Sequence, residues 1–226
     1  MVKSMQPLAL TPDVLKQRLR EQRDLFNQSH STRLHRAISW WQAALDHSAD
    51  DDMRFIAAWI SFSACVVTDR NNLSLAEQSA FNDFIARLVA LDSDERIYDC
   101  LWHQYSGSVK ALIKNPYVFA PFWQSQRSGD EHWKSLFDQS SVAALNALSR
   151  RKVPELLAIV LDRLCVLHQQ VVNGGATYKS QVNRDQVIDG GNLLLTLMPI
   201  IIAIMLDAAD QEWGELAYPV VGNASS

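Results

Sequence analysis

One stretch of the chain, VLHQQVVNGGATYKSQVNRDQV from Val166 to Val187, gathers residue types that can do chemistry. An imidazole such as that of His168 transfers protons near neutral pH, whereas the amide of Asn173 only donates and accepts hydrogen bonds. An aromatic ring beside cations can stack on bases and pair with phosphates. The candidates form a catalytic group of His168, Gln169 and Asn173, and an RNA-binding group of Tyr178, Lys179 and Arg184.

The same residues also fit an ordinary helix end. Four residues of an expected helix over 153–172 share one stripe, at spacings of four, three and four: Leu157, Leu161, Leu164 and His168. This stripe predicts that His168 faces the core, or a partner packed on the stripe. Asn173 then ends the helix, and Gly174 supplies the left-handed residue that follows it. The alternative to a catalytic site is therefore a core histidine, a capping asparagine and a glycine stop.

Several segments together resemble the HEPN family (higher eukaryotes and prokaryotes nucleotide-binding domain), in its bacterial Apea-like or ribonuclease-type form. HQQVVNGGAT and NRDQV stand where many members read Arg-Asn-x-x-x-His-Gly-Gly-Ala-Thr and then Asn-Arg-x-Gln. The segments RLHRAISWW, RFIAAWISFSA and NPYVFAPFW extend the resemblance over roughly residues 20 to 205. The resemblance implies an all-α domain, a metal-independent ribonuclease centre without a cofactor, and a homodimer that brings two motifs together.

The Arg-x4-His motif of the family is degenerate here. His168 stands where the family has Arg, Asn173 stands where it has His, and Gln169 takes the polar second position. The family His is thought to assist attack of the ribose 2′-OH, and the Arg to stabilise the phosphate charge. Asn173 cannot transfer a proton, and His168 lacks a permanent charge and a bidentate fork.

The degenerate motif indicates a protein that binds RNA or a partner protein with weak or no cleavage. One alternative is an active metal-independent endoribonuclease of a phage-defence or toxin–antitoxin system that uses His168. Another is a non-catalytic interaction module that binds an antitoxin or a defence partner protein, as relatives often do.

A second reading of the motif pairs Arg163 with His168, which also gives Arg-x4-His. Residues five apart on an ideal helix point about 140° apart, so these two would not converge in mid-helix. We therefore favour the His168 and Asn173 pair and expect Arg163 to be a surface charge.

The helices that position these residues are indicated by apolar residues at helical spacing, with few glycines or prolines and no persistent period of two. Expected helices cover 11–28, 31–47, 53–67, 74–91, 93–114, 129–150, 153–172 and 183–210. Thr11, Ser93–Glu95 and the Ser74–Glu77 box are expected caps, and Pro154 and Pro199 are expected to start one helix and kink the last.

This pattern predicts one all-α domain of about seven or eight helices over 11–212, with tails at 1–10 and 213–226. The aromatic segment NPYVFAPFW, 115–123, is expected to pack on the helices beneath it, with a ligand platform as the alternative.

Composition limits the function classes. A net charge of -4, with 48% hydrophobic residues, excludes general binding of polyanions, so any contact with nucleic acid needs a local basic patch. The spot Arg33, His35 and Arg36 is expected to be a solvated face, and Asp50–Asp52 a loop and helix start.

The cysteines and the apolar segments indicate a cytoplasmic protein. Cys65, Cys100 and Cys165 lack metal-binding spacing and are expected to be buried thiols. The first residues lack the features of a signal peptide. The run 193–206 contains Pro199 and is too short for a bilayer, so we expect a core helix and no membrane contact.

Overall fold

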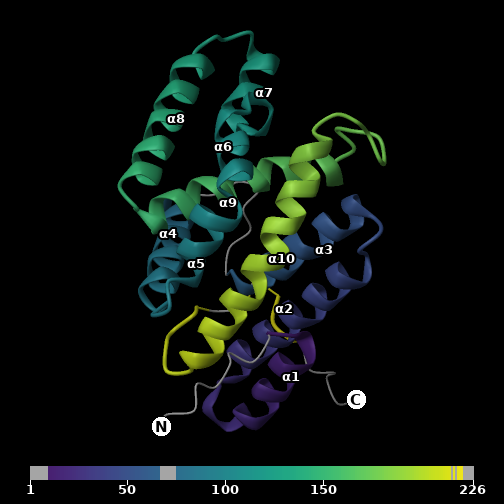
Figure 1. Cartoon of the computed structure of the whole chain (residues 1–226), viewed down its shortest axis with the longest axis vertical. Coiled ribbons are helices and arrows are strands. Elements are labelled where there is room, and N and C mark those ends of the chain that lie inside the picture. The colour runs from purple at the N-terminus through teal and green to yellow at the C-terminus, as the bar shows by residue number, and fades with distance from the viewer. Residues whose placement is uncertain (1–9, 67–74, 215, 217, 221–226) are drawn as a thin grey trace, which may run out of the picture.

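The computed structural model describes residues 10–66, 75–214, 216 and 218–220, and within these ranges it is all helical, as expected. The described residues form ten α-helices rather than seven or eight. Figure 1 shows their arrangement. They are α1 (Pro12–Glu21), α2 (Gln28–Asp46), α3 (Asp51–Cys65), α4 (Leu75–Ala90), α5 (Arg96–Asp99), α6 (Ser106–Lys114), α7 (Ala120–Ser128), α8 (Trp133–Ser149), α9 (Val153–Val172) and α10 (Arg184–Asp207). Short turns η1 (Arg23–Leu25), η3 (Cys100–Gln104) and η4 (Pro116–Val118) complete the helical elements.

The helices are arranged around α9 and α10. In Figure 1, α9 crosses the molecule, α10 runs over it, and α6, α7 and α8 stand together at one end. α3 packs against α2, α9 and α10. The glycine at 190 allows this three-way contact, because a Cβ there would lie 2.8 Å from Leu164 Cδ2 and 3.2 Å from Phe55 Cε2.

The long helix α10 is the expected core helix. It is long and apolar enough to cross a membrane, but 67% of its most apolar window is buried inside the fold. Pro199 lies within it and removes the N–H that would bond to the carbonyl of Leu195. The indole Nε1 of Trp41 donates to that carbonyl at 3.2 Å, so the proline leaves no unpaired acceptor there. The kink at Pro199 stays a prediction.

The helix starts follow the sequence in part. The side chain of Thr11 accepts from the backbone N–H of Val14, as expected, and Pro154 lies in the first turn of α9. The predicted cap at Ser93–Glu95 is wrong, because Asp92 Oδ2 accepts from the N–H of Ile97 at 2.7 Å instead. Ser74, the first residue of the predicted capping box, lies outside the described residues.

The single helix expected over 93–114 is divided into α5, the π-helical turn η3 and α6. The aromatic segment 115–123 likewise contains η4 and the start of α7, with Pro121 in the first turn of that helix. Proline is tolerated in the first turn, where its missing N–H has no intrahelical partner in any case. These divisions account for the higher number of helices.

Arg33 does not lie on a solvated face, as the sequence reading expected. Its side chain is 1% exposed and donates to the backbone carbonyls of Trp213 and Gly214. Trp213 is itself buried, and its indole donates to the carbonyl of Ala208 at 3.1 Å. The packed chain therefore continues past position 212, where we expected the tail to begin.

Buried cysteines complete the core. Cys65, Cys100 and Cys165 are buried thiols, as predicted, and none of them forms a disulfide with another described residue. Burial raises the pKa of the Cys65 and Cys100 thiols to about 12, so both stay protonated at neutral pH.

Candidate functional site

The C-terminal end of α9 has the geometry that the glycines predict. Asn173 is the C-cap residue of α9, and Gly174, which follows it, has a left-handed φ of 70°. The N–H of Gly174 bonds to the carbonyl of Val171 at 3.3 Å, and that of Gly175 bonds to Gln170 at 2.7 Å. These two bonds are a Schellman motif, which pairs carbonyls at the helix end and turns the chain away. The predicted capping role of Asn173 and Gly174 is thus confirmed.

His168 faces the core rather than solvent. Its ring stacks on Trp59 of α3 at a centroid distance of 5.4 Å and meets the edge of Phe55 at 6.5 Å. No hydrogen bond to its ring nitrogens is found in the described part of the chain. Burial lowers the pKa of His168 to about 4, so the ring is neutral at physiological pH. The stripe of Leu157, Leu161 and Leu164 is fully buried within the same chain, and so a partner is not needed to cover it.

The three candidate catalytic residues have different surroundings. Asn173 is exposed at the helix end, while Gln169 is half-buried and donates from Nε2 to Cys165 Sγ at 3.8 Å. Within the described residues, no hydrogen bond joins His168 to either of them. Within the described residues the three do not form a proton relay, because no hydrogen bond joins His168 to the other two and this one titratable ring, with a pKa of about 4, is a weak base near neutral pH.

The prediction that Arg163 is a surface charge is wrong. Its side chain is 1% exposed, and its guanidinium lies 4.2 Å from the ring centroid of Phe119 and 5.5 Å from that of Phe137. One nitrogen donates to Ser140 Oγ at 2.9 Å. Desolvation lowers the pKa of Arg163 to about 10, which leaves it charged at neutral pH. Arg163 thus faces α8 while His168 faces α3, and the two do not converge, as expected.

The loop over 173–183 carries two of the candidate RNA-binding residues, Tyr178 and Lys179, and Arg184 follows it as the first residue of α10. Side-chain contacts hold this loop against the start of α3. The hydroxyl of Tyr178 donates to Asp50, and the backbone N–H of Lys179 donates to Asp52 Oδ2 at 2.7 Å. The bond from Tyr178 and the charge of Lys179 help to hold the pKa of Asp50 below its usual range. Arg184 adds a further contact with α3, because it forms an ion pair with Asp52 Oδ1 at 2.7 Å.

Lys179 has a left-handed φ of 56°, a conformation that costs a non-glycine residue about 1–2 kcal/mol. The bond from its N–H to Asp52 stabilises that conformation. Its ammonium lies 5.1 Å from the centroid of the Tyr178 ring, so these two side chains are close together. The acids at 50–52 start α3, as predicted, and Asp50 also accepts from the N–H of Met53.

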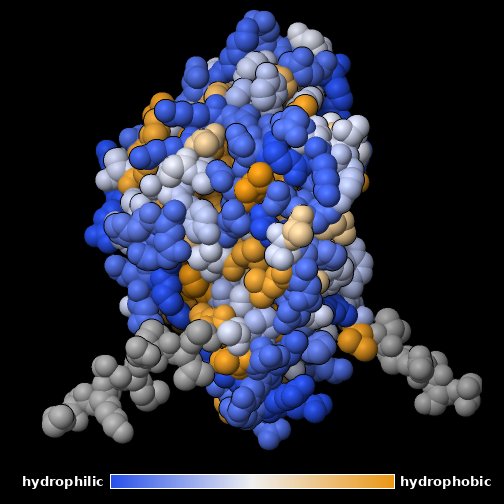
Figure 2. All heavy atoms as spheres, turned by 45° about the vertical axis from the view of Figure 1, so that its right-hand side comes forward, coloured by the Kyte–Doolittle hydropathy of each residue, from blue (hydrophilic) through white to orange (hydrophobic). Residues whose placement is uncertain are grey.

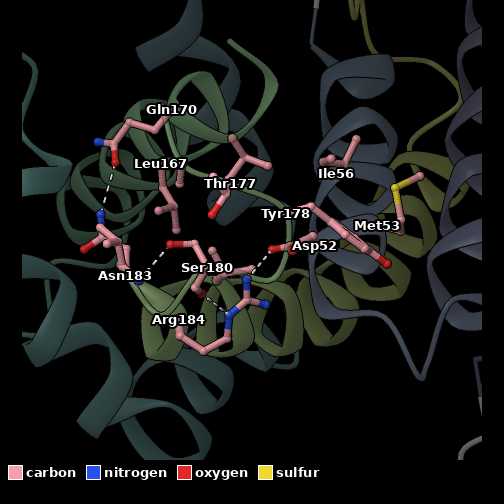
Figure 3. A pocket seen from close by; sticks show the side chains of 14 residues that line it. Asp52, Met53, Ile56, Leu167, Gln170, Thr177, Tyr178, Ser180, Asn183 and Arg184 are labelled. Atoms are coloured by element: carbon pink, nitrogen blue, oxygen red, sulfur yellow. Dashed lines mark hydrogen bonds and ion pairs between the residues drawn. The ribbon is translucent and has the colours of Figure 1, made fainter. Parts of the chain in front are cut away.

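A cavity of about 170 Å³ lies between this loop, α3 and the end of α9 (Figure 3). Ten of its lining residues are Asp52, Met53, Ile56, Leu167, Gln170, Thr177, Tyr178, Ser180, Asn183 and Arg184. The amide of Asn183 donates to Gln170 Oε1 at 3.1 Å, which links the two ends of the loop. Tyr178 and Arg184 of the RNA-binding group line the cavity, whereas none of the three candidate catalytic residues does.

Sequence reasoning missed the residues that hold this loop in place. Asp52 is 6% exposed and binds both Lys179 and Arg184, and Gln170 joins Asn183 to the carbonyl of Tyr117. The sequence did hold a hint of the role of Asp52. It is the third acid in a row at a helix start, where one acid is enough for the cap. Nothing in the spacing of Gln170 and Asn183 pointed to their pairing.

The described residues contain no group of three or more His, Cys, Asp or Glu side chains that could hold a metal ion. No protein-family model, curated protein or solved structure matches the chain.

Proposed function

We propose that this protein is an HEPN-like RNA-binding protein whose ribonuclease centre is degenerate, so that it binds RNA with weak or no cleavage. The observation that carries the proposal is the state of His168. It is neutral, half-buried and stacked on Trp59, whereas a phosphate-binding residue at that position would need a permanent charge.

The chemistry of the helix end supports the same reading. Asn173 cannot act as a general base, although it is exposed at the position where the family has its histidine. A histidine with a pKa of about 4 is a weak base, and proton transfer is most efficient when the pKa is close to the working pH. Both groups that cleavage needs are therefore deficient in this chain.

The test is a gain of activity on single-stranded RNA in EDTA, with the products separated on a gel at several pH values. The double change His168→Arg and Asn173→His should raise cleavage, because it restores a permanent charge and a titratable base at the helix end. Each single change should do much less, since charge stabilisation and proton transfer act on one transition state. Robust cleavage by the unaltered protein that disappears in His168→Ala would instead favour the active endoribonuclease.

A second candidate is a non-catalytic module for a protein partner, such as an antitoxin or a defence protein. The charges around the 173–183 loop favour it, because Asp52 neutralises Arg184, and Asp50 engages Tyr178. The side chains of Tyr178 and Val182 are each 65% exposed and are available to a protein partner. Co-purification of a stoichiometric partner that is lost in Val182→Glu would favour this candidate.

We also propose a cytoplasmic homodimer, on the basis of the resemblance. Light scattering at micromolar concentration should give twice the mass of one chain. Because the leucine stripe of α9 is filled within one chain, the contact would involve the end of that helix, where Val172 is 47% exposed. A monomer at these concentrations would contradict the dimer.

A further inference from the structure

Two neighbouring aromatic rings are exposed where α6 leads into α7. Tyr117 is 51% exposed and Trp123 is 40% exposed, and their ring centroids are 6.5 Å apart. The indole Nε1 of Trp123 donates to the backbone carbonyl of Tyr117 at 2.8 Å. Phe122 packs edge-on against both rings, at 5.3 Å and 5.1 Å. The rings are therefore fixed in place while part of each remains open to solvent.

Exposed cations accompany these rings. Lys110 and Lys114 lie one turn apart on α6, Lys114 is three residues before Tyr117, and Arg127 lies one turn after Trp123 on α7. Residues four apart on a helix are neighbours on its surface. All three cations are exposed, and none forms an ion pair with any residue that the structure describes.

The charge of this end of the molecule differs from that of the rest. Residues 106–149, which span α6, α7 and α8, carry four Lys or Arg and three Asp or Glu, for a net charge of +1. The remainder carries seventeen and twenty-two, for a net charge of -5. Figure 1 shows these helices standing together beyond α9, so this end of an acidic protein carries no net negative charge.

We propose that Tyr117, Trp123, Lys110, Lys114 and Arg127 form a surface that binds single-stranded RNA, which we call the α6–α7 surface. A single strand alternates bases with phosphates, and proteins bind it by stacking its bases on aromatic rings and tracking its backbone with cations. Fixed, exposed rings flanked by unpaired cations match both needs. An acidic peptide would use the cations but has no regular series of flat rings to stack.

The inference rests on the proposed function and assigns its RNA contacts to a different place from the 173–183 loop. Next to that loop, Arg184 at the start of α10 is paired with Asp52, and the carboxylates of Asp50 and Asp52 repel phosphate. The α6–α7 surface adjoins the end of α9 all the same, because Gln170 of α9 donates to the carbonyl of Tyr117. RNA bound there would lie next to the degenerate centre.

The experiment measures fluorescence anisotropy of a labelled, mixed-sequence single-stranded RNA of about 12 nucleotides, a length within the range of such sites. Changing Tyr117 and Trp123 together to Ala should weaken binding roughly 5- to 100-fold, the effect of losing one stacked base or more. Changing Lys114 and Arg127 together to Gln should lower the salt dependence, by about 0.7 in the logarithmic slope for each cation. Because both cations are exposed, this second pair of changes tests the surface even if the ring variant folds poorly.

The matched control is Trp40→Ala on α2, which removes a tryptophan that is 42% exposed, close to the exposure of Trp123. Its RNA affinity should stay within about twofold of the unaltered protein, well below the effect of a stacked ring. Equal losses in both tryptophan variants would overturn the α6–α7 surface.

The remaining outcomes separate this inference from the proposed function. Loss of binding in Tyr178→Ala with Lys179→Ala, but not in the ring variant, would overturn the α6–α7 surface and leave an RNA-binding protein. A chain that binds no RNA would overturn both. Displacement of the RNA by a poly-glutamate peptide as effectively as by unlabelled RNA would overturn RNA as the occupant.

Discussion

At the scale of single residues, His168 and Arg163 show how burial decides what a side chain can do. Five residues apart on one helix, they face different neighbours, Trp59 and Phe55 in one case and Phe119 and Phe137 in the other. Burial lowers the pKa of both, which keeps the imidazole neutral but does not discharge the guanidinium at pH 7. Neither residue is presented to solvent as a catalytic group would be.

His168 should titrate with a pKa of about 4 when the chain is followed by NMR, with His168→Gln used to assign the resonance. The sign of the stability effect follows, because a depressed pKa means that the folded state binds the proton less readily than the unfolded state. Stability contributed by the neutral ring is present above the unfolded pKa of about 6.5 and is lost as pH falls toward 4. The variant should flatten this part of the pH dependence. Titration near the ordinary value would contradict the buried position of the ring.

Arg163 should be replaceable by methionine at little cost to stability. Among the described residues its guanidinium has one hydrogen bond, to Ser140, and Nε and Nη1 are buried with no hydrogen-bond partner there. Apolar replacement of a poorly compensated buried charge is often neutral or stabilising, whereas truncation leaves a cavity. Urea unfolding should therefore show Arg163→Met unchanged or more stable, and Arg163→Ala about 2–4 kcal/mol less stable. A methionine variant as unstable as the alanine variant would mean that the charge has a partner.

At the scale of elements, the site depends on how the 173–183 loop is held between α9, α10 and the start of α3. The glycines end α9 by a Schellman motif, and Asp52 binds the loop from the opposite side. Gln170 and Asn183 join the two ends of the loop. The loop is thus fixed by its own glycines and Asn183 together with side chains from α3, α9 and α10.

Asp52→Asn should loosen this loop without unfolding the domain. The change weakens the ion pair to Arg184 and the bond to the N–H of Lys179, whose left-handed backbone depends on it. Hydrogen exchange should become faster at Lys179 and stay unchanged in α10. Asp51→Asn is the control, because Asp51 pairs with Arg54 and not with the loop. Equal acceleration in both variants would show that the loop is not held by Asp52.

The contact between α10, α9 and α3 should tolerate no side chain at position 190. Gly190→Ala places a methyl group 2.8 Å from Leu164, and overpacking of this kind costs roughly 1–3 kcal/mol. Gly107→Ala in α6 has nothing within 4 Å and should stabilise the chain by about 0.5–1 kcal/mol, the usual gain in helix propensity. A stabilising Gly190→Ala, measured by thermal unfolding, would contradict the close packing.

At the scale of the whole molecule, the fold was easier to predict than the site. Helical periodicity was enough for the all-α class, and the Asn-Gly-Gly stop predicted the end of α9 correctly. Arg33 and Arg163 were misjudged because their charge indicates exposure, while their burial depends on distant partners such as Trp213 and Phe119. Contacts between segments far apart in the chain leave no mark in local spacing.

The distribution of charged and hydrophobic side chains over the surface is also a property of the whole molecule. Hydrophilic side chains cover most of the face shown in Figure 2, with hydrophobic ones in small separate groups. Over α6, α7 and α8 the chain carries four Lys or Arg and three Asp or Glu, whereas the remainder carries seventeen and twenty-two. The end with the α6–α7 surface therefore lacks the negative charge that would repel a polyanion from the rest of the chain.

The central claim, that the end of α9 lies beside bound RNA but does not cleave it, is tested most directly by recovering that RNA. Labelled single-stranded RNA is incubated with the unaltered protein in EDTA, binding is measured, and the same RNA is then run on a denaturing gel. The account predicts that the RNA is bound and comes back intact from acidic to mildly alkaline pH. RNA that is bound and cut, with cutting abolished in His168→Ala, would contradict it.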